Sequence, residues 1–410
     1  MFKKFFSLAL LLFIFSTLSE AQTLDNYLAA GMKNSPLLKD YVNQLRSGGV
    51  DSSLVAATFK TQVNLTSQAM IAPTANNFGY DAAITNGGNF SGLVSANQTL
   101  FNKKIKSEQY KTIQLTNQSL QVTKKLSETE LEKTITNQYL TAYNNYSQIH
   151  FNQLVLKLLE GEFSTLKVLV QKGIYLQTDY LNLSASIQSQ KISIKQSFIQ
   201  FKNELATLNY ICGINDTSTV ELQYPTIKLE NSFNLMNSLQ MEQFRIDSLK
   251  NTNQKALVDL NYRPQLSAFA DAGFGAVTPV NIPYNFGTSI GLNFSMPLYD
   301  GKQRKLQYNK ISIAEETRQY YKDFYQKQFS QQYIQLKEQL KLNDELIVEI
   351  KGQLTNQEQL IGLYKTEIEK GLVRFLDFLT VVNNYVSTKN NLTVAEMNRL
   401  QIMNQLNYLK

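Results

Sequence analysis

Few side chains in this sequence could carry out covalent or metal chemistry. The 410 residues include one cysteine, Cys212, and one histidine, His150. His150 lies in a helical pattern without metal-ligand spacing around it, and zinc sites of this type need several Cys or His ligands. Gly48-Gly49 and Gly87-Gly88 fall in predicted turns and match no phosphate-binding loop. The sequence therefore predicts no catalytic residue, no metal site and no cofactor, so we expect a protein that is not an enzyme.

A carboxylate recurs at the same distance from a glycine in each half of the chain. Asp179 lies six residues after Gly173, and Asp377 lies six residues after Gly371. Glycine costs about 1 kcal/mol in the middle of a helix, so each glycine predicts a turn between two helices. Taken alone, an aspartate at this place caps or solvates the turn.

These two segments belong to a longer internal duplication. Its three landmarks are Asn97-Gln98-Thr99-Leu100-Phe101 with Ser295-Met296-Pro297-Leu298-Tyr299, Gln171-Lys172-Gly173-Ile174 with Glu369-Lys370-Gly371-Leu372, and Leu208-Asn209 with Leu406-Asn407. The second member of each pair lies 198 positions after the first. A constant offset over three landmarks predicts two tandem repeats of one structural unit.

Each repeat contains a long helical pattern. Residues 103–209 and 301–410 contain no proline, and their apolar residues recur every three or four positions. This pattern predicts helices far longer than the usual length of about 10 to 14 residues. A helix of about 50 residues would be roughly 75 Å long. To bury their apolar seams, the two helices of each repeat should fold back on each other as antiparallel coiled coils.

Ahead of each helical pattern the period changes from 3.6 to two. Apolar and polar residues alternate over 63–71, 266–274 and 290–298, and more weakly over 90–100. We therefore expect four strands, one hairpin in each repeat, with one apolar and one polar side. Strands of about 9 to 11 residues suit a membrane barrel, whereas the apolar side would be core in a soluble sheet. A barrel needs about eight strands, so four would have to combine with strands of other copies.

The N-terminal segment indicates export. Lys3 and Lys4 precede an apolar run, and Ser19-Glu20-Ala21 offers a small-x-small cleavage site, so residues 1–21 read as a signal peptide. An uncleaved anchor is the alternative, but the run is shorter than the roughly 20 residues of a spanning helix. The net charge of +7 is modest and its basic residues are interleaved with polar ones. This distribution argues against nucleic acid as a partner.

These patterns divide the chain into eight segments. They are a signal peptide (1–21), an N-terminal helix (22–58), a first β-hairpin (59–101), a first long helical hairpin (102–210), a linker (211–230), a helix (231–262), a second β-hairpin (263–299) and a second long helical hairpin (300–410).

This order of segments resembles the TolC-type outer membrane efflux proteins. The family's strand-to-helix junction reads roughly Pro-Leu-Phe-Asp-Gly-Gly, and the corresponding residues here are Pro297, Leu298, Tyr299, Asp300, Gly301 and Lys302. Further similar segments are Thr23-Leu24-Asp25-Asn26-Tyr27-Leu28 with Asn34-Ser35-Pro36, Arg263-Pro264, Lys172-Gly173 to Leu181, and Lys370-Gly371 to Leu379. The resemblance extends over nearly the whole chain after the signal peptide. It implies that helix 22–58 is periplasmic, that hairpins 59–101 and 263–299 are transmembrane, and that the linker 211–230 is an equatorial segment that adds small strands.

The resemblance implies a mainly α-helical fold with transmembrane β-strands, in a homotrimer. Three chains would give four strands each to a twelve-stranded barrel in outer membrane lipid, continued by a helical tunnel in the periplasm. Such a duct is a passive exit path of a tripartite efflux or type I secretion system, and it works with a periplasmic adaptor (membrane fusion) protein and an inner-membrane pump. The alternative is a secreted, structural coiled-coil protein without a membrane barrel.

The resemblance also assigns roles to the two glycine segments as tunnel tips. An aspartate ring constricts the closed tunnel in the family, and Asp377 matches its first position, while Thr380 replaces a second carboxylate found in some members. Asp179, the corresponding residue of the first repeat, and Thr380 are included with Asp377 as expected gate residues. The expected adaptor contacts and tip residues are Gly173, Ile174, Leu176, Gly371, Leu372 and Phe375.

Overall fold

The computed structural model describes residues 22–73, 78–81, 87–216, 218–229 and 235–409. The expected signal peptide, residues 1–21, lies outside this part of the chain. The chain divides into two compact units. The first contains residues up to Lys39, Lys125–Ser238 and Tyr325–Lys410, and the second contains Asp40–Lys124 and Leu239–Phe324.

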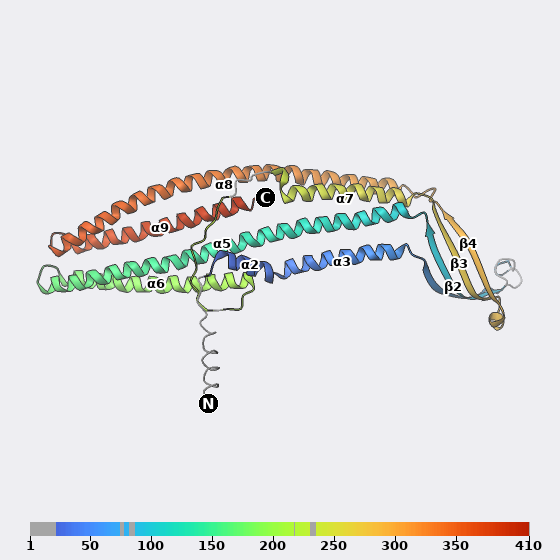
Figure 1. Ribbon diagram of the computed structural model, residues 1–410, viewed down its shortest axis with the longest axis horizontal. Coiled ribbons are helices and arrows are strands. Elements are labelled where there is room, and N and C mark those ends of the chain that lie inside the picture. Colours follow the sequence, from blue (N-terminus) through green and yellow to red (C-terminus); the bar gives the residue numbers. More distant parts are fainter. Residues whose placement is uncertain (1–21, 74–77, 82–86, 217, 230–234, 410) are drawn as a thin grey trace, which may run out of the picture. The chain divides into compact units, whose positions relative to one another are not determined.

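Most of the described chain is helical, with one small antiparallel sheet (Figure 1), as the sequence predicts. In chain order the elements are α2 (Leu24–Asn34), α3 (Pro36–Thr58), β1 (Gln62–Ile71), β2 (Gly88–Leu100), α5 (Lys103–Gln171), α6 (Gln177–Cys212), the 3₁₀ turn η1 (Leu235–Asn237), α7 (Leu239–Asn261), β3 (Gln265–Ala276), the 3₁₀ helix η2 (Pro279–Tyr284), β4 (Phe286–Ser295), α8 (Gln303–Glu369) and α9 (Phe375–Asn407). No helix in the described part of the chain carries an apolar stretch long enough to cross a membrane.

Two details differ from the sequence-based expectations. Gly48 and Gly49 lie inside α3 rather than in a turn. A Cβ on Gly48 would come 2.2 Å from the Asn117 amide oxygen of α5, so close packing explains this glycine better than a turn does. The last strand ends at Ser295, so the expected continuation to Leu298 is wrong. Pro297 cannot donate a backbone hydrogen bond to a strand ladder, which is consistent with an early end.

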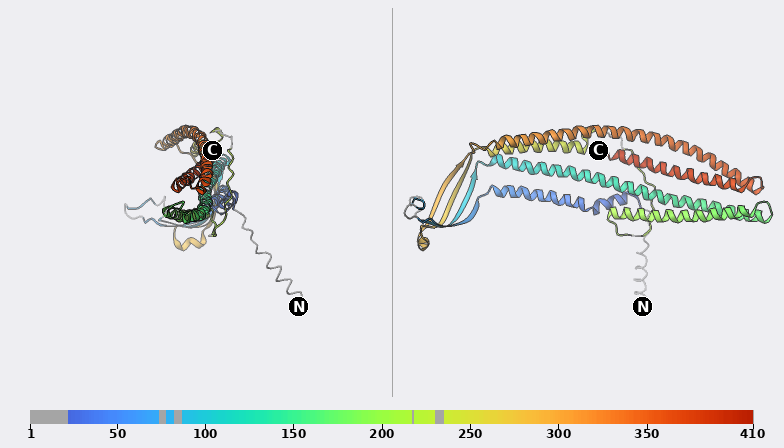
Figure 2. Two further views of the ribbon diagram at one scale, coloured as in Figure 1. Left: turned by 90° about the vertical axis from the view of Figure 1, so that its left-hand side faces the viewer. Right: turned by 180° about the vertical axis from the view of Figure 1, so that it is seen from behind.

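The second unit contains the whole sheet. Its strand order is β1-β2-β3-β4, and every neighbouring pair is antiparallel. β1–β2 and β3–β4 are the two expected hairpins, and β2–β3 joins them through eleven paired positions from Phe90–Ala276 to Leu100–Leu266. The right view of Figure 2 shows the strands side by side. Segments that are far apart in the sequence therefore pair to form one continuous sheet.

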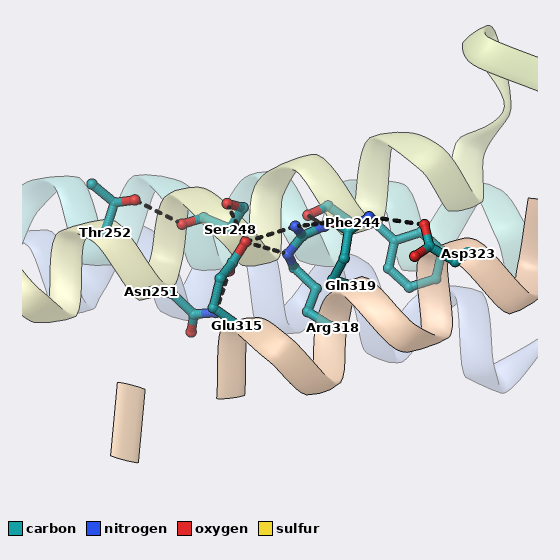
Figure 3. A network of polar contacts seen from close by, with 8 residues as sticks. All are labelled: Phe244, Ser248, Asn251, Thr252, Glu315, Arg318, Gln319 and Asp323. Carbon is teal, nitrogen blue, oxygen red and sulfur yellow. Dashed lines mark hydrogen bonds and ion pairs between the residues drawn. The ribbon is translucent and has the colours of Figure 1, made fainter. Parts of the chain in front are cut away.

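A polar network fixes α7 to the first part of α8 in the second unit (Figure 3). One oxygen of Glu315 accepts hydrogen bonds from the Arg318 guanidinium at 2.6 and 2.9 Å and from the Ser248 hydroxyl at 3.0 Å. Its other oxygen accepts from the Asn251 amide at 2.9 Å. Arg318 also donates to the backbone carbonyl of Phe244 at 3.4 Å. Two residues of α8 therefore satisfy three groups of α7.

We expect this network to make stability depend on pH. Hydrogen bonds from Arg318, Asn251 and Ser248 lower the pKa of Glu315 from 4.5 to about 2. Because the folded protein binds this proton more weakly than the unfolded chain does, the stabilisation is complete above pH 4.5 and is lost as the pH falls towards about 2. Between pH 4.5 and about 2, the free energy of unfolding should therefore change less with pH for Glu315→Gln than for the unchanged protein. The same pH dependence in both proteins would contradict the assignment.

The first unit has a core that the linker helps to close. Tyr27, Tyr139, Phe201 and Cys212 are buried together there. The Tyr139 hydroxyl lies 2.7 Å from the carbonyl oxygen of Gln223 and 2.9 Å from that of Gln22. Gln22 and Leu222 form a parallel β-bridge, so the described part of the linker contributes this bridge and not the expected small strands. Buried Tyr139 holds the start of the described chain and the linker against α5.

Candidate functional site

In the single chain, the apolar side of the sheet is exposed and not covered by other elements that the structure describes. In the observed register, Leu65 lies opposite Val94, Val94 opposite Ala272, and Ala270 opposite Ile290. These residues share one face with other apolar side chains, namely Val63, Ala69, Ile71, Phe90, Ala96, Leu266, Ala268, Phe274, Phe286, Leu292 and Phe294. Leu65 is 77% and Ile290 87% exposed. Water contact of so large an apolar face is unfavourable, so it marks a surface that contacts lipid or another apolar partner.

The opposite side of the sheet is mostly polar, with Met70, Leu93 and Phe269 as its apolar side chains, and it has a single charge. Its residues include Gln62, Asn64, Thr66, Gln68, Asn89, Ser91, Ser95, Asn97, Gln265, Ser267, Asp271, Ser289, Asn293 and Ser295. Asp271 is half-buried and lies between Ser95 of β2 and Ser289 of β4. The Ser289 hydroxyl donates to the Asp271 carboxylate at 3.2 Å. This face suits contact with water.

The junction between β4 and α8 is built around Asp300. Its carboxylate accepts hydrogen bonds from the backbone N–H groups of Lys302 at 2.9 Å and Arg304 at 2.8 Å, which satisfies free donors at the start of α8. A hydrogen bond from Tyr262, together with those backbone groups, lowers the pKa of Asp300. Gly301 has a positive φ of 63°, which glycine adopts without steric cost.

The other predicted junction residues differ in their exposure. Leu298 is 91% and Tyr299 86% exposed, directly after Pro297. The junction motif therefore has two roles, since Asp300 and Gly301 shape the backbone and the two side chains before them face outward.

The two glycine segments form the turns between the long helices of the first unit. Gly173 has φ 74° and follows the end of α5, and Gly371 has φ 69° and follows the end of α8. Figure 1 shows α6 and α9 returning from these turns along α5 and α8. A Cβ on Gly371 would come 2.7 Å from Ile174, so the two turns, called the tips below, touch each other.

Tyr175 connects the two tips. Its hydroxyl lies 2.8 Å from the carbonyl oxygen of Val373 and 3.3 Å from that of Ile368. The ring is buried and packs edge-on against Phe375, with ring centroids 6.2 Å apart. Burial and then the nearby Asp179 raise the pKa of Tyr175, so the hydroxyl keeps its proton and donates. The sequence reasoning missed Tyr175, although its place two residues after Gly173 could have indicated it.

The two aspartates of the tips have different partners. The Asp179 carboxylate accepts a hydrogen bond from the backbone N–H of Leu176 at 3.1 Å, so it caps the start of α6. The Asp377 carboxylate accepts two hydrogen bonds from the Arg374 guanidinium, at 3.0 and 3.1 Å. Arg374 also escaped the sequence reasoning. Thr380 donates to the Leu376 carbonyl at 3.0 Å, within its own helix. Asp377 therefore has a counter-cation three residues away.

Among the expected adaptor contacts, Phe375 is incorrectly assigned. Ile174, Leu176 and Leu372 are 48%, 69% and 71% exposed and can meet a partner. Phe375 is fully buried, because its ring lies between Tyr175 and Phe378 in the core of the tips. The next residue, Leu376, is 55% exposed and faces outward instead.

The single histidine and the single cysteine lie in different surroundings. His150 is exposed and its ring stacks edge-on against Tyr146. Cys212 is buried, and burial raises the pKa of its thiol to about 11. Among the residues that the structure describes, no group of three or more His, Cys, Asp or Glu side chains is placed to hold a metal ion.

Solved structures of outer membrane proteins share this fold. The outer membrane protein VceC of Vibrio cholerae is similar with a TM-score of 0.76 at 13% identity, over 94% of this chain and 95% of that one. The outer membrane channel CmeC of Campylobacter jejuni gives 0.74 at 12%, over 95% and 86%. The open state of the MtrE outer membrane channel of Neisseria gonorrhoeae gives 0.75 at 11%, over 94% and 88%.

Comparison of the sequence alone gives no match. No protein-family model matches it, and no curated protein sequence matches it either. The similarity to the solved structures nevertheless extends over nearly the whole chain and includes both the long helices and the sheet. The chain thus has the fold of these outer membrane proteins, and the mainly helical fold with a small antiparallel sheet that the TolC-type resemblance implies is confirmed.

Proposed function

We propose that this protein is an outer membrane exit duct of a tripartite efflux or type I secretion system. The observation that carries the proposal is a channel-type fold whose sheet has one open apolar face and one polar face. Leu65 and Ile290 on the apolar face would contact lipid, and the polar residues around Asp271 would contact water in the duct. The long helices would continue the path into the periplasm. The duct is passive, with transport energy supplied by an inner-membrane pump.

The proposal includes three copies of the chain. Within the described residues β1 pairs with β2 alone and β4 with β3 alone, so both outer strands have a free edge. Free edges are unfavourable in a membrane because their backbone groups need partners there. Joining the β4 edge of one copy to the β1 edge of the next removes these edges. Three copies give the twelve-stranded barrel, and the 198-residue duplication supports a pseudo-sixfold arrangement of equivalent hairpins.

The exposed residues of the tips support a docking role for an adaptor protein. Ile174, Leu176 and Leu372 are apolar and exposed. Leu376 joins them, while buried Phe375 does not. An adaptor with an apolar helical end would cover these side chains.

The arrangement can be tested by cross-linking and fractionation. A variant that carries one new cysteine at the β1 edge and one at the β4 edge should give disulfide-linked dimers and trimers after oxidation in outer membrane fractions. The native Cys212 is buried and should not react. A monomer in the soluble periplasmic fraction would contradict the duct and support the alternative of a secreted coiled-coil protein.

The gate role of Asp377 gives a prediction with a matched set of variants. Asp377→Ala should raise single-channel conductance or weaken cation block in planar bilayers, because it removes the carboxylate proposed to constrict the tip. Arg374→Ala should strengthen cation block, since it leaves that carboxylate without its guanidinium partner. Asp179→Ala tests the gate role expected for the first repeat, and it should change conductance less than Asp377→Ala because the Asp179 carboxylate caps the start of α6. Identical behaviour of all three variants would remove Asp377 from the gate.

A further inference from the structure

We propose that Asp271 sets the charge preference of the duct and makes its membrane section favour cations over anions. The inference rests on the proposed function, because it requires the polar face of the sheet to line a water-filled path. It concerns a residue in the sheet and is independent of the aspartate gate at the tips.

Asp271 is the sole ionisable side chain in the four strands. β1, β2 and β4 contain no Asp, Glu, Lys, Arg, His, Cys or Tyr, and β3 contains Asp271 alone. Over residues 62–100 and 265–295, loops included, the sequence adds a single further charge, Asp81. A surface with so little charge makes one carboxylate decisive for the local potential.

The register places Asp271 on the side that would face water. Its neighbours across the sheet are Ser95 and Ser289, whereas Val94 and Ala270 belong to the opposite, apolar face. A charge on a lipid-facing side of a barrel costs energy in a depth-dependent way, so the polar side is where a carboxylate is tolerated. The position of Asp271 is therefore consistent with a duct lining and not with lipid contact.

No basic side chain among the described residues forms an ion pair with Asp271. The hydrogen-bond partner that the structure gives it is the neutral Ser289 hydroxyl, at 3.2 Å. The residues beside it on the same face include Gly273 and Gly287, which face each other across β3 and β4. They help to line a hollow of about 390 Å³ that Asp271 and Ser289 share. Phe269 and Leu93 lie on the same face, but the two glycines leave the hollow open beside the carboxylate, so hydrated ions can approach it there.

The carboxylate of Asp377 differs from that of Asp271 in having a charged partner. That carboxylate has a guanidinium at 3.0 Å, so its charge is partly neutralised within the tip. A ring of three Asp271 side chains would carry about three negative charges without basic partners in the strands. Rings of acidic side chains favour cations in channels, and their field extends over roughly 10 Å at 0.1 M salt.

Reversal potentials in a KCl gradient across neutral-lipid bilayers test the inference. We expect the unchanged protein to have a potassium-to-chloride permeability ratio above one. Asp271→Asn should reduce this ratio by about twofold or more, because it removes the ring charge at nearly constant size. Asp271→Glu should keep the ratio near that of the unchanged protein.

A relocated charge provides the sharpest control. Ser95 lies opposite Asp271 on the same face, so Ser95→Asp combined with Asp271→Asn returns one carboxylate at the same level of the sheet. This double variant should restore the cation preference. Asp377→Asn provides the comparison with the tip and should change the ratio less than Asp271→Asn does.

The outcomes separate this inference from the proposed function. If the unchanged protein and Asp271→Asn have the same potassium-to-chloride permeability ratio, the inference is wrong, but the proposed duct is unaffected. A ratio at or below one in the unchanged protein, or one controlled by Asp377 alone, also overturns it. A folded protein that forms no channels at all contradicts the duct itself, and the inference with it.

Discussion

Gly273→Ala should prevent the two hairpins from joining into one sheet. A Cβ at this position would come 2.1 Å from the carbonyl oxygen of Gly92 and 2.9 Å from the Leu93 Cα. Both atoms belong to the backbone of β2, which cannot move aside without breaking the β2–β3 ladder. This ladder joins the hairpins of the two repeats, so we expect a severe loss of folded protein. The measurement is the yield of membrane-inserted protein whose gel mobility shifts on heating.

The same strand contains a matched control for Gly273. An added Cβ at Gly275 has no atom within 4 Å, so Gly275→Ala should keep a normal yield. Both substitutions add one methyl group to β3, and they differ in whether that methyl group meets the neighbouring backbone. Equal yields for the two variants would show that the approach of β2 to β3 does not limit folding.

Phe375→Ala should cause the largest loss of stability at the tips. The ring is fully buried between Tyr175 and Phe378, and removing a buried phenylalanine costs about 3–5 kcal/mol. We expect a lower free energy of unfolding in denaturant. We also expect faster hydrogen exchange at the amides of residues 368–378. The Phe375 ring packs against Tyr175, whose hydroxyl donates to the carbonyl groups of Ile368 and Val373.

Leu376→Ala is the appropriate comparison for Phe375. Leu376 is adjacent in the same helix but is 55% exposed, and exposed substitutions of this kind change stability by about 0.5 kcal/mol or less. The two variants also separate folding from docking. Leu376→Ala should weaken adaptor binding with little effect on stability, whereas a loss of stability similar to that of Phe375→Ala would contradict the observed burial.

The local patterns predicted much of the architecture. Periods of two and 3.6 residues place the strands and the long helices, since these periods follow from backbone geometry and from which side of an element is apolar. Glycines at 173 and 371 indicate the tips because positive φ angles favour glycine there. The same local reasoning failed at Gly48, because a glycine that admits a neighbouring helix looks like a turn glycine in the sequence.

The side-chain partners at the candidate sites were beyond sequence reasoning. Asp179 and Asp377 look equivalent by spacing, yet one caps a helix and the other pairs with Arg374. Tyr175 gained its importance from two carbonyl groups that lie nearly 200 residues away in the chain. Phe375 looked like an exposed apolar contact, because spacing from Gly371 does not reveal which side of the turn is covered.

The sequence by itself determined the classes of element, their order and the near absence of charge in the strands. It could do so because each of these properties depends on neighbouring residues. Only the tertiary structure decided the pairing of β2 with β3, the position of Asp271 between two serines and the contact between the two tips. These features depend on strand register and on packing between distant segments, and no local period specifies which distant residue becomes the partner.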